Sequence, residues 1–233
     1  GITGGYQMIV IAPKDFRTQA ADYASYRSGL SPYPLSTSVF YVDEIMNEFA
    51  GGLLDPTAIR DFIKYAYENW QTKPSYVLLF GNGTYDYLNV EAANNNFVPT
   101  YQTQESLYEI DSYPSDSYYA RVSGNDFKAD VAIGRLPIRT ADDAQNVLDK
   151  IKKYETGLEK GVWRNSITLV ADDGPAALGA DDGSTHTAQS ETLANYFLPK
   201  YFNLNKIYLV AYPTVYSGTG RKKPAVNQAI LDA

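Results

Sequence analysis

The sequence contains no cysteine and only one histidine, His186, in 233 residues. The absence of cysteine excludes a thiol nucleophile, a disulfide, a thiolate-bound metal and an iron–sulfur cluster within this stretch of chain. One imidazole is too few for a zinc or iron site that needs two or three histidines. A Ser–His–Asp triad would have to use His186, but no Gly-x-Ser-x-Gly turn follows any expected strand. We therefore interpret His186 as a surface or capping-region residue.

Long apolar runs and an excess of positive charge are also missing. Twenty Lys and Arg residues stand against 27 Asp and Glu, and the resulting net charge of −7 makes nucleic acid a poor partner. The basic run at residues 221–223 is too short to reverse this, and we interpret it as a solvated helix start. No stretch approaches the roughly 18 apolar residues that cross a membrane. The phosphate-loop and dinucleotide-binding glycine patterns are absent as well.

Apolar strands alternate with amphipathic helices along the chain. Several continuous apolar runs are typical of parallel strands that are covered on both faces, namely residues 6–12, 38–42, 76–80, 167–171 and 206–211. Asp55 followed by Pro56, and Thr140 followed by Asp143, are signals for helix starts. The alternation predicts an α/β fold with a mostly parallel sheet flanked by helices and joined by right-handed crossovers.

Two parts of the chain are expected, 1–160 as a first α/β subdomain and 161–233 as the start of a second, incomplete one. The first part includes a stretch at 82–115 that is rich in Asn, Tyr, Pro and Thr. Such a composition predicts a long loop, and loops of this length in compact domains commonly carry function.

Shorter elements are expected after the long loop and in the second part. Residues 116–122 and 130–133 are predicted to be short strands around a Gly-Asn turn, so that 115–137 forms a hairpin. A helix is predicted over 186–198, with Leu193 and Phe197 facing inward.

Aspartates gather where strands are expected to end. In parallel α/β sheets ligands bind outside the carboxyl ends of the strands, where this chain has Gly81-Asn82-Gly83 and Asp172-Asp173-Gly174. Because Ca²⁺ is bound by several carboxylate and carbonyl oxygens, a structural calcium site is predicted. Its candidate ligands are Asp86, Asp116 and Asp172. The alternative is that these aspartates only make turns and helix caps.

Three stretches carry a resemblance to a known family, namely residues 76–86, 113–137 and 163–174. The most specific part is Ser115-Asp116 together with the run Asp-Val-Ala-Ile-Gly-Arg-Leu-Pro that ends at Pro137. Together they resemble the gingipain-type cysteine peptidases, and most closely the PorU-like sortases of the type IX secretion system. The likeness runs from about residue 6 to the end of the chain.

The resemblance implies a caspase-like α/β fold of two side-by-side subdomains and a Cys–His dyad. The dyad is implied to lie in a Gly-His-Gly stretch and at a later strand end that bears cysteine, and this sequence contains neither. No catalytic residue is therefore assigned, no cofactor is required, and the segment is expected to be inactive alone. It also starts without methionine and ends inside an expected helix, which predicts a piece truncated before the last strands of its sheet.

The resemblance also implies what the longer protein does. It is expected to be a cysteine endopeptidase or sortase in protein secretion or surface processing, acting on protein or peptide substrates. The implied location is extracytoplasmic, in the periplasm, outer membrane or cell surface of a Gram-negative bacterium, with other secretion-system components as partners. Within the shared motif, Asp116 and Arg135 look architectural, and we expect them to form a buried ion pair.

Two other functions are compatible with the residues. The chain could be a non-catalytic α/β ligand-binding or secretion-scaffold domain, or it could bind carbohydrate through its tyrosine-rich loop, since 21 residues are tyrosine. A sheet that lacks its last strands also exposes an unpaired edge, so edge-strand self-association is predicted.

Overall fold

The computed structural model describes residues 4–86, 90, 96–103, 112–157, 160–173, 182–218 and 220–233. The chain divides into two compact units, Gly1–Thr156 and Gly157–Ala233. In the described ranges, no helix has the length and apolar character that crossing a bilayer requires.

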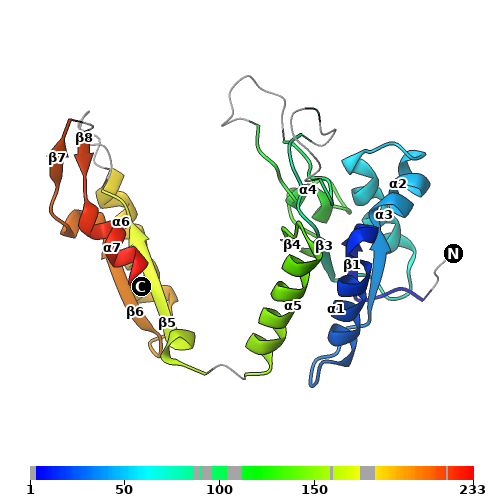
Figure 1. Ribbon diagram of the computed structural model, residues 1–233, viewed down its shortest axis with the longest axis horizontal. Helices are drawn as coiled ribbons and strands as arrows, with labels where there is room; N and C mark the ends of the chain where they lie inside the picture. The colour runs from blue at the N-terminus through cyan, green and yellow to red at the C-terminus, as the bar shows by residue number, and fades with distance from the viewer. Residues whose placement is uncertain are drawn as a thin grey trace. The chain divides into compact units, whose positions relative to one another are not determined.

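The first unit is built on a four-stranded parallel sheet in the order β2-β1-β3-β4 (Figure 1). The strands are β1 (Met8–Ala12), β2 (Thr37–Tyr41), β3 (Tyr76–Phe80) and β4 (Ala132–Leu136). All five residues of β1 are buried, because β1 has neighbouring strands on both edges and helices on both faces. The predicted parallel sheet flanked by helices is confirmed.

Helices cover both faces of this sheet. The helices α1 (Arg17–Gly29) and α5 (Ala141–Glu155) pack on the face that carries Met8 and Val10. The opposite face, which carries Ile9 and Ile11, is covered by α2 (Val42–Ala50), α3 (Pro56–Asn69) and α4 (Ser117–Ala120). Successive residues of β1 therefore enter two separate cores, as the alternation of side chains along a strand requires.

The two helix-start signals read from the sequence are confirmed. The Asp55 carboxylate accepts a 2.8 Å hydrogen bond from the backbone N–H of Thr57 at the start of α3, where Pro56 occupies the first helical position. At the start of α5, Thr140 and Asp143 form a reciprocal capping box with bonds of 3.0 and 3.1 Å.

The predicted hairpin at 115–137 is wrong. Residues 117–120 form the short helix α4, and β4 pairs in parallel with β3 instead of antiparallel with a neighbouring hairpin strand. A helical turn lets the adjacent side chains of Tyr119 and Ala120 both enter the core, whereas a strand would point them to opposite faces. The Asp130 carboxylate accepts from the N–H groups of Val122 and Ser123, which closes the connection without strand pairing.

The second unit contains a parallel pair, β5 (Ser166–Ala171) and β6 (Asn203–Tyr208), and an antiparallel hairpin, β7 (Val215–Ser217) and β8 (Gly220–Lys222). Its helices are α6 (Asp182–Thr192) and α7 (Pro224–Leu231), with a 3₁₀ turn at Val162–Asn165 and another at Leu209–Ala211. The basic run is not a solvated helix start, because Arg221 and Lys222 lie in β8 and only Lys223 stands at the N-cap position of α7.

The helix expected at 186–198 has a different end from the one predicted. Residues 193–197 form a π-helical turn after α6, closed by the Leu198 N–H bonding to the Leu193 carbonyl at 3.0 Å. The wider turn breaks the 3.6-residue period on which the inward-facing stripe was predicted. Leu193 is 48% and Phe197 71% exposed, so the prediction that they face inward is wrong.

Candidate functional site

The carboxyl edge of the first sheet is the place where this topology favours a binding site. The chain leaves β1 toward β2 and returns to β3 on the other side of β1, so the direction of winding changes there. The segment at 96–100 is fixed at this edge. The backbone N–H groups of Phe97 and Val98 both bond to the Asn82 carbonyl just beyond β3, at 2.9 and 3.0 Å. Phe97 also packs on Phe16, which follows β1, with ring centres 4.9 Å apart.

Arg135 on β4 joins three separate segments at this edge. Its Nε and Nη2 donate to the two carboxylate oxygens of Asp116 at 2.8 and 2.7 Å. Its Nη1 donates to the carbonyls of Gly81 and Val98 at 2.9 and 2.7 Å, and Nη2 also donates to the Pro99 carbonyl at 3.2 Å. All five N–H donors of the guanidinium therefore have acceptors.

The Arg135–Asp116 ion pair expected from the shared motif is confirmed. The side chains are only 14% and 26% exposed, respectively, so solvent screens the pair little. The ion pair links Asp116 to β4. The three hydrogen bonds to carbonyls link β4 to the end of β3 and to residues 98–99. This assembly, which we call the Arg135 cluster, holds residues 98–99 and Asp116 against the end of β3.

The two glycines of Gly81-Asn82-Gly83 are required by close backbone approach at the Arg135 cluster. A Cβ atom on Gly83 would lie 2.7 Å from the Val98 carbonyl oxygen and 3.1 Å from Nη1 of Arg135. A Cβ on Gly81 would lie 2.9 Å from the Val98 side chain. The absence of side chains thus lets the segment at 96–100 lie directly against the end of β3.

We expect Gly83→Ala to lower the free energy of unfolding of the first unit by about 1–3 kcal/mol, because the added methyl group displaces a backbone carbonyl that Arg135 binds. Gly134→Ala is the matched control, since a Cβ there meets no atom within 4 Å. The measurement is chemical denaturation of both variants beside the parent. Equal stability of Gly83→Ala and Gly134→Ala would contradict the close approach.

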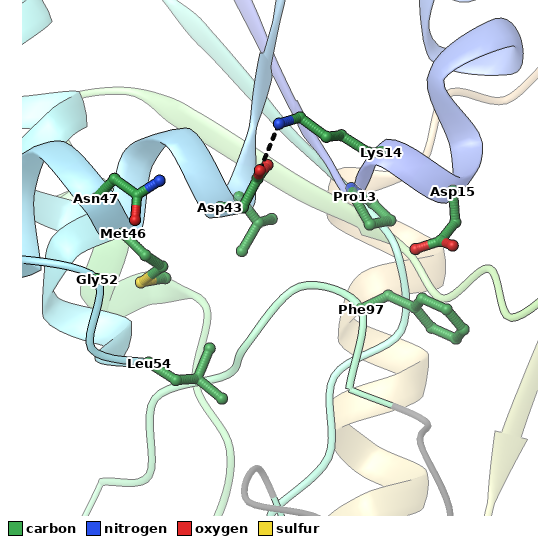
Figure 2. A pocket seen from close by; sticks show the side chains of 10 residues that line it. Pro13, Lys14, Asp15, Asp43, Met46, Asn47, Gly52, Leu54 and Phe97 are labelled. Carbon is green, nitrogen blue, oxygen red and sulfur yellow. Dashed lines mark hydrogen bonds and ion pairs between the residues drawn. The ribbon is translucent and has the colours of Figure 1, made fainter.

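A pocket of about 400 Å³ opens at the same edge, at the ends of β1 and β2 (Figure 2). Its described lining is Pro13, Lys14, Asp15, Val42, Asp43, Met46, Asn47, Gly52, Leu54 and Phe97. Figure 2 shows Lys14 pointing toward Asp43, with which it forms an exposed ion pair. Their mutual hydrogen bond lowers the pKa of Asp43 and raises the pKa of Lys14. These lining residues include no hydroxyl or thiol that could act as a nucleophile. The pocket instead offers apolar side chains, those of Met46, Leu54 and Phe97, beside a charged pair.

The three candidate calcium ligands each contact a different partner. Both oxygens of Asp116 bind Arg135, Oδ1 of Asp86 accepts from the Val90 N–H at 2.7 Å, and Asp172 contacts Nδ1 of His186. Across the described ranges, no group of three or more His, Asp or Glu side chains is placed to hold a metal ion. The calcium site therefore stays a prediction.

Asp172 and His186 meet at the carboxyl end of β5, in the second unit. Both side chains are about half exposed, which agrees with the interpretation of His186 as a surface residue. Sequence reasoning missed the pairing, since nothing in either local sequence marks the partner.

A more buried ion pair in the second unit was also missed. Lys223 Nζ lies 2.8 Å from Oδ2 of Asp173, with the side chains only 9% and 12% exposed, and it also donates to the Leu209 carbonyl. Near the end of the neighbouring strand, Tyr208 donates to Glu191 at 2.8 Å. Burial and then this bond raise the pKa of Tyr208 to about 12, so its phenol stays a donor at neutral pH.

Comparison with known proteins identifies the family of this chain. The model of peptidase family C25 matches residues 3–233. Gingipain R2 of Porphyromonas gingivalis is 25% identical over 192 residues, which are 81% of this chain and 22% of that protein. Gingipain R1 of the same organism is 24% identical, again over 81% of this chain but 16% of that protein. The chain thus spans about a fifth of the length of these curated relatives.

Solved structures show the same fold. Dimeric latent PorU from P. gingivalis superposes with a TM-score of 0.59 at 24% identity, covering 76% of this chain and 20% of that chain. The Arg-specific cysteine proteinase gingipain R (RgpB) superposes with a TM-score of 0.57 at 23% identity, covering 88% of this chain and 41% of that chain. The fold is the caspase-like α/β fold of these proteins, as the resemblance implied. Since the family model matches nearly the whole sequence, this chain belongs to peptidase family C25.

Proposed function

We propose that this chain is the scaffold segment of a gingipain-like cysteine endopeptidase or sortase that acts in protein secretion or surface processing. The observation that carries the proposal is the family match over residues 3–233 in a sequence that contains no cysteine. A cysteine peptidase needs a thiolate, so the nucleophile must come from sequence outside these residues. The chain by itself is then inactive, and its part is to place the substrate and the loops around the reacting groups.

The chemistry of such a peptidase defines what the scaffold has to do. The histidine takes the thiol proton, the thiolate attacks the scissile carbonyl, and backbone N–H groups stabilise the oxyanion of the tetrahedral intermediate. Each step needs atoms held to within a fraction of an ångström, which rigid sheet edges provide better than free loops. The Arg135 cluster supplies this rigidity in the first unit. The segment that includes Phe97, held by it, forms one wall of the proposed substrate cleft.

The proposed location and partners rest on the relatives. Gingipains R1 and R2 and PorU come from one bacterium, P. gingivalis, and the likeness to PorU supports a role in secretion. We propose an extracytoplasmic protein of a Gram-negative bacterium, in the periplasm, outer membrane or cell surface. Its substrates are proteins or peptides, and its partners include other secretion-system components.

A thiol-reactive peptidyl ketone tests the proposal on the full-length protein. We expect covalent labelling of a cysteine outside residues 1–233, blocked by prior alkylation, while this chain alone stays unlabelled. A full-length protein that resists labelling and cleaves no protein substrate would overturn the peptidase function in favour of a non-catalytic scaffold. Adding an amine acceptor separates the two activities, because a sortase transfers the acyl group to the amine and an endopeptidase releases the free acid.

We also propose that the chain self-associates through exposed strand edges. In the described residues, β2 and β4 each lack a partner strand on one side, and such edges favour pairing with another chain. The expected result is a sedimentation coefficient that rises with protein concentration. A constant monomer value up to the solubility limit would contradict it.

A further inference from the structure

A second pocket of the first unit lies away from the pocket of Figure 2, beside α3 and α4. Its volume is about 710 Å³. The described residues that line it are Arg60, Tyr101, Thr103, Tyr113, Tyr118, Arg121, Gly124, Asn125, Asp126 and Phe127. The helices α3 and α4, which supply Arg60 and Tyr118, pack against each other (Figure 1). We call this the two-arginine pocket.

Within the part of the chain that the structure describes, its two arginines bind backbone carbonyls and no acid. Nε of Arg60 donates to the Arg121 carbonyl at 2.9 Å, and Nε of Arg121 donates to the Ser117 carbonyl at 3.2 Å. Both bonds use Nε of the arginine and leave its Nη groups available. A guanidinium binds a carboxylate more strongly than a carbonyl. Arg27 and Arg135 of the same unit each have a carboxylate partner. The acid in the lining, Asp126, instead accepts the Lys128 N–H of its own turn at 3.1 Å.

Aromatic rings form the rest of the wall. Tyr101 and Tyr118 stack face to face, with ring centres 3.7 Å apart and planes 8° apart. Arg60 lies over Tyr118 at 5.3 Å and Arg121 over Phe127 at 5.6 Å, so each guanidinium rests on an aromatic ring. Phe127 is 90% exposed at the rim and Tyr113 56% exposed. An exposed phenylalanine beside two guanidinium groups is a surface that a ligand with apolar and anionic groups would cover.

We propose that the two-arginine pocket binds an acidic peptide segment. Carboxylates of the peptide pair with Arg60 and Arg121, and an apolar side chain between them packs on Phe127 and Tyr113. Charge argues for this ligand, because the chain carries a net charge of −7 and yet presents here two cations that have no acid partner among the described residues. Size argues for a peptide over a small free anion, because the volume suits a ligand of several residues. The proposal does not require the bound segment to be cleaved.

The test uses a capped peptide of alternating Glu and Phe, with the same peptide carrying Gln for Glu as its control, and titration calorimetry on the full 233-residue chain. We expect the Glu peptide to bind about tenfold or more tightly than the Gln peptide, and Arg121→Gln, which leaves only Arg60, to reduce that difference to about threefold. Phe127→Ala should weaken binding about threefold or more without harm to folding, because the ring is almost fully exposed. Arg139→Gln, at an exposed arginine outside the pocket, should change nothing.

Three outcomes overturn the proposal. The first is equal binding of the Glu and Gln peptides. The second is an unchanged affinity for the Glu peptide in Arg121→Gln, or in Arg60→Gln if Arg121→Gln does not fold. The third is binding of inorganic phosphate or glucuronate as tight as that of the Glu peptide together with no effect of Phe127→Ala, which would identify a simple anion site. Unlabelled full-length protein in the thiol-probe experiment leaves these results unaffected, so the two proposals fail separately.

Discussion

Replacing Arg135 with alanine is expected to lower the free energy of unfolding of the first unit by about 3 kcal/mol. The substitution removes five hydrogen bonds, which the Asp116 carboxylate and the carbonyls of Gly81, Val98 and Pro99 accept, and only the Pro99 carbonyl keeps a second side-chain donor, the Tyr119 hydroxyl. A half-buried carboxylate that loses its cation keeps the cost of its own desolvation, which is why the loss exceeds that of a surface ion pair. Calorimetry should show the transition of this unit roughly 10 °C lower.

Two further variants distinguish the loss of the five hydrogen bonds from the loss of the positive charge and from the loss of a long side chain. Arg135→Lys keeps the positive charge but has a single ammonium group that cannot reach five acceptors, so most of the destabilisation should remain. Arg139→Ala removes an exposed arginine nearby and should change stability by less than about 0.5 kcal/mol. If Arg135→Ala behaves like Arg139→Ala, the Arg135 cluster does not support the fold.

Only part of the Arg135 cluster could be predicted from the sequence. The pair with Asp116 followed from two charged residues in one motif. The carbonyls of Gly81, Val98 and Pro99 left no signal, because every residue carries a backbone carbonyl and the sequence does not show which of them Arg135 reaches. The sequence also did not indicate why residues 81 and 83 are glycine. Their role in close packing became visible only with the opposing chain in place.

The regular elements were predictable where one periodicity dominates over enough residues. The runs that became β1 and β3 are continuously apolar, which distinguishes doubly covered parallel strands from half-exposed ones. The helix α4 has only four residues, too few for a 3.6-residue period to show, so residues 116–122 were predicted to be a strand. The Lys223–Asp173 pair was unpredictable for another reason, since it joins residues far apart in the sequence and its lysine belongs to a basic run.

Tyr119 carries the second large effect that we expect. Its side chain is fully buried in the core between the sheet and α3, and its phenol donates to the Pro99 carbonyl at 2.8 Å. Burial raises the pKa of Tyr119, so the phenol remains a donor throughout the pH range in which proteins are stable. Tyr119→Ala should lower the free energy of unfolding by about 3–5 kcal/mol, because it leaves a ring-sized cavity and a lost donor. Tyr33→Ala, at an 80% exposed ring, is the control and should be close to neutral in the same denaturation experiment.

Tyr119→Phe isolates the hydrogen bond from the ring and connects it to Arg135. The Pro99 carbonyl accepts from both the Tyr119 hydroxyl and Nη2 of Arg135, so either donor can satisfy it when the other is removed. Tyr119→Phe alone should therefore cost only about 1 kcal/mol. In the double variant with Arg135→Ala the carbonyl loses both donors, and the combined loss should exceed the sum of the single losses by about 0.5–1 kcal/mol. If the losses of the two single variants add up to the loss of the double variant, Tyr119 and Arg135 stabilise the fold independently. The Pro99 carbonyl that they share would then not couple them.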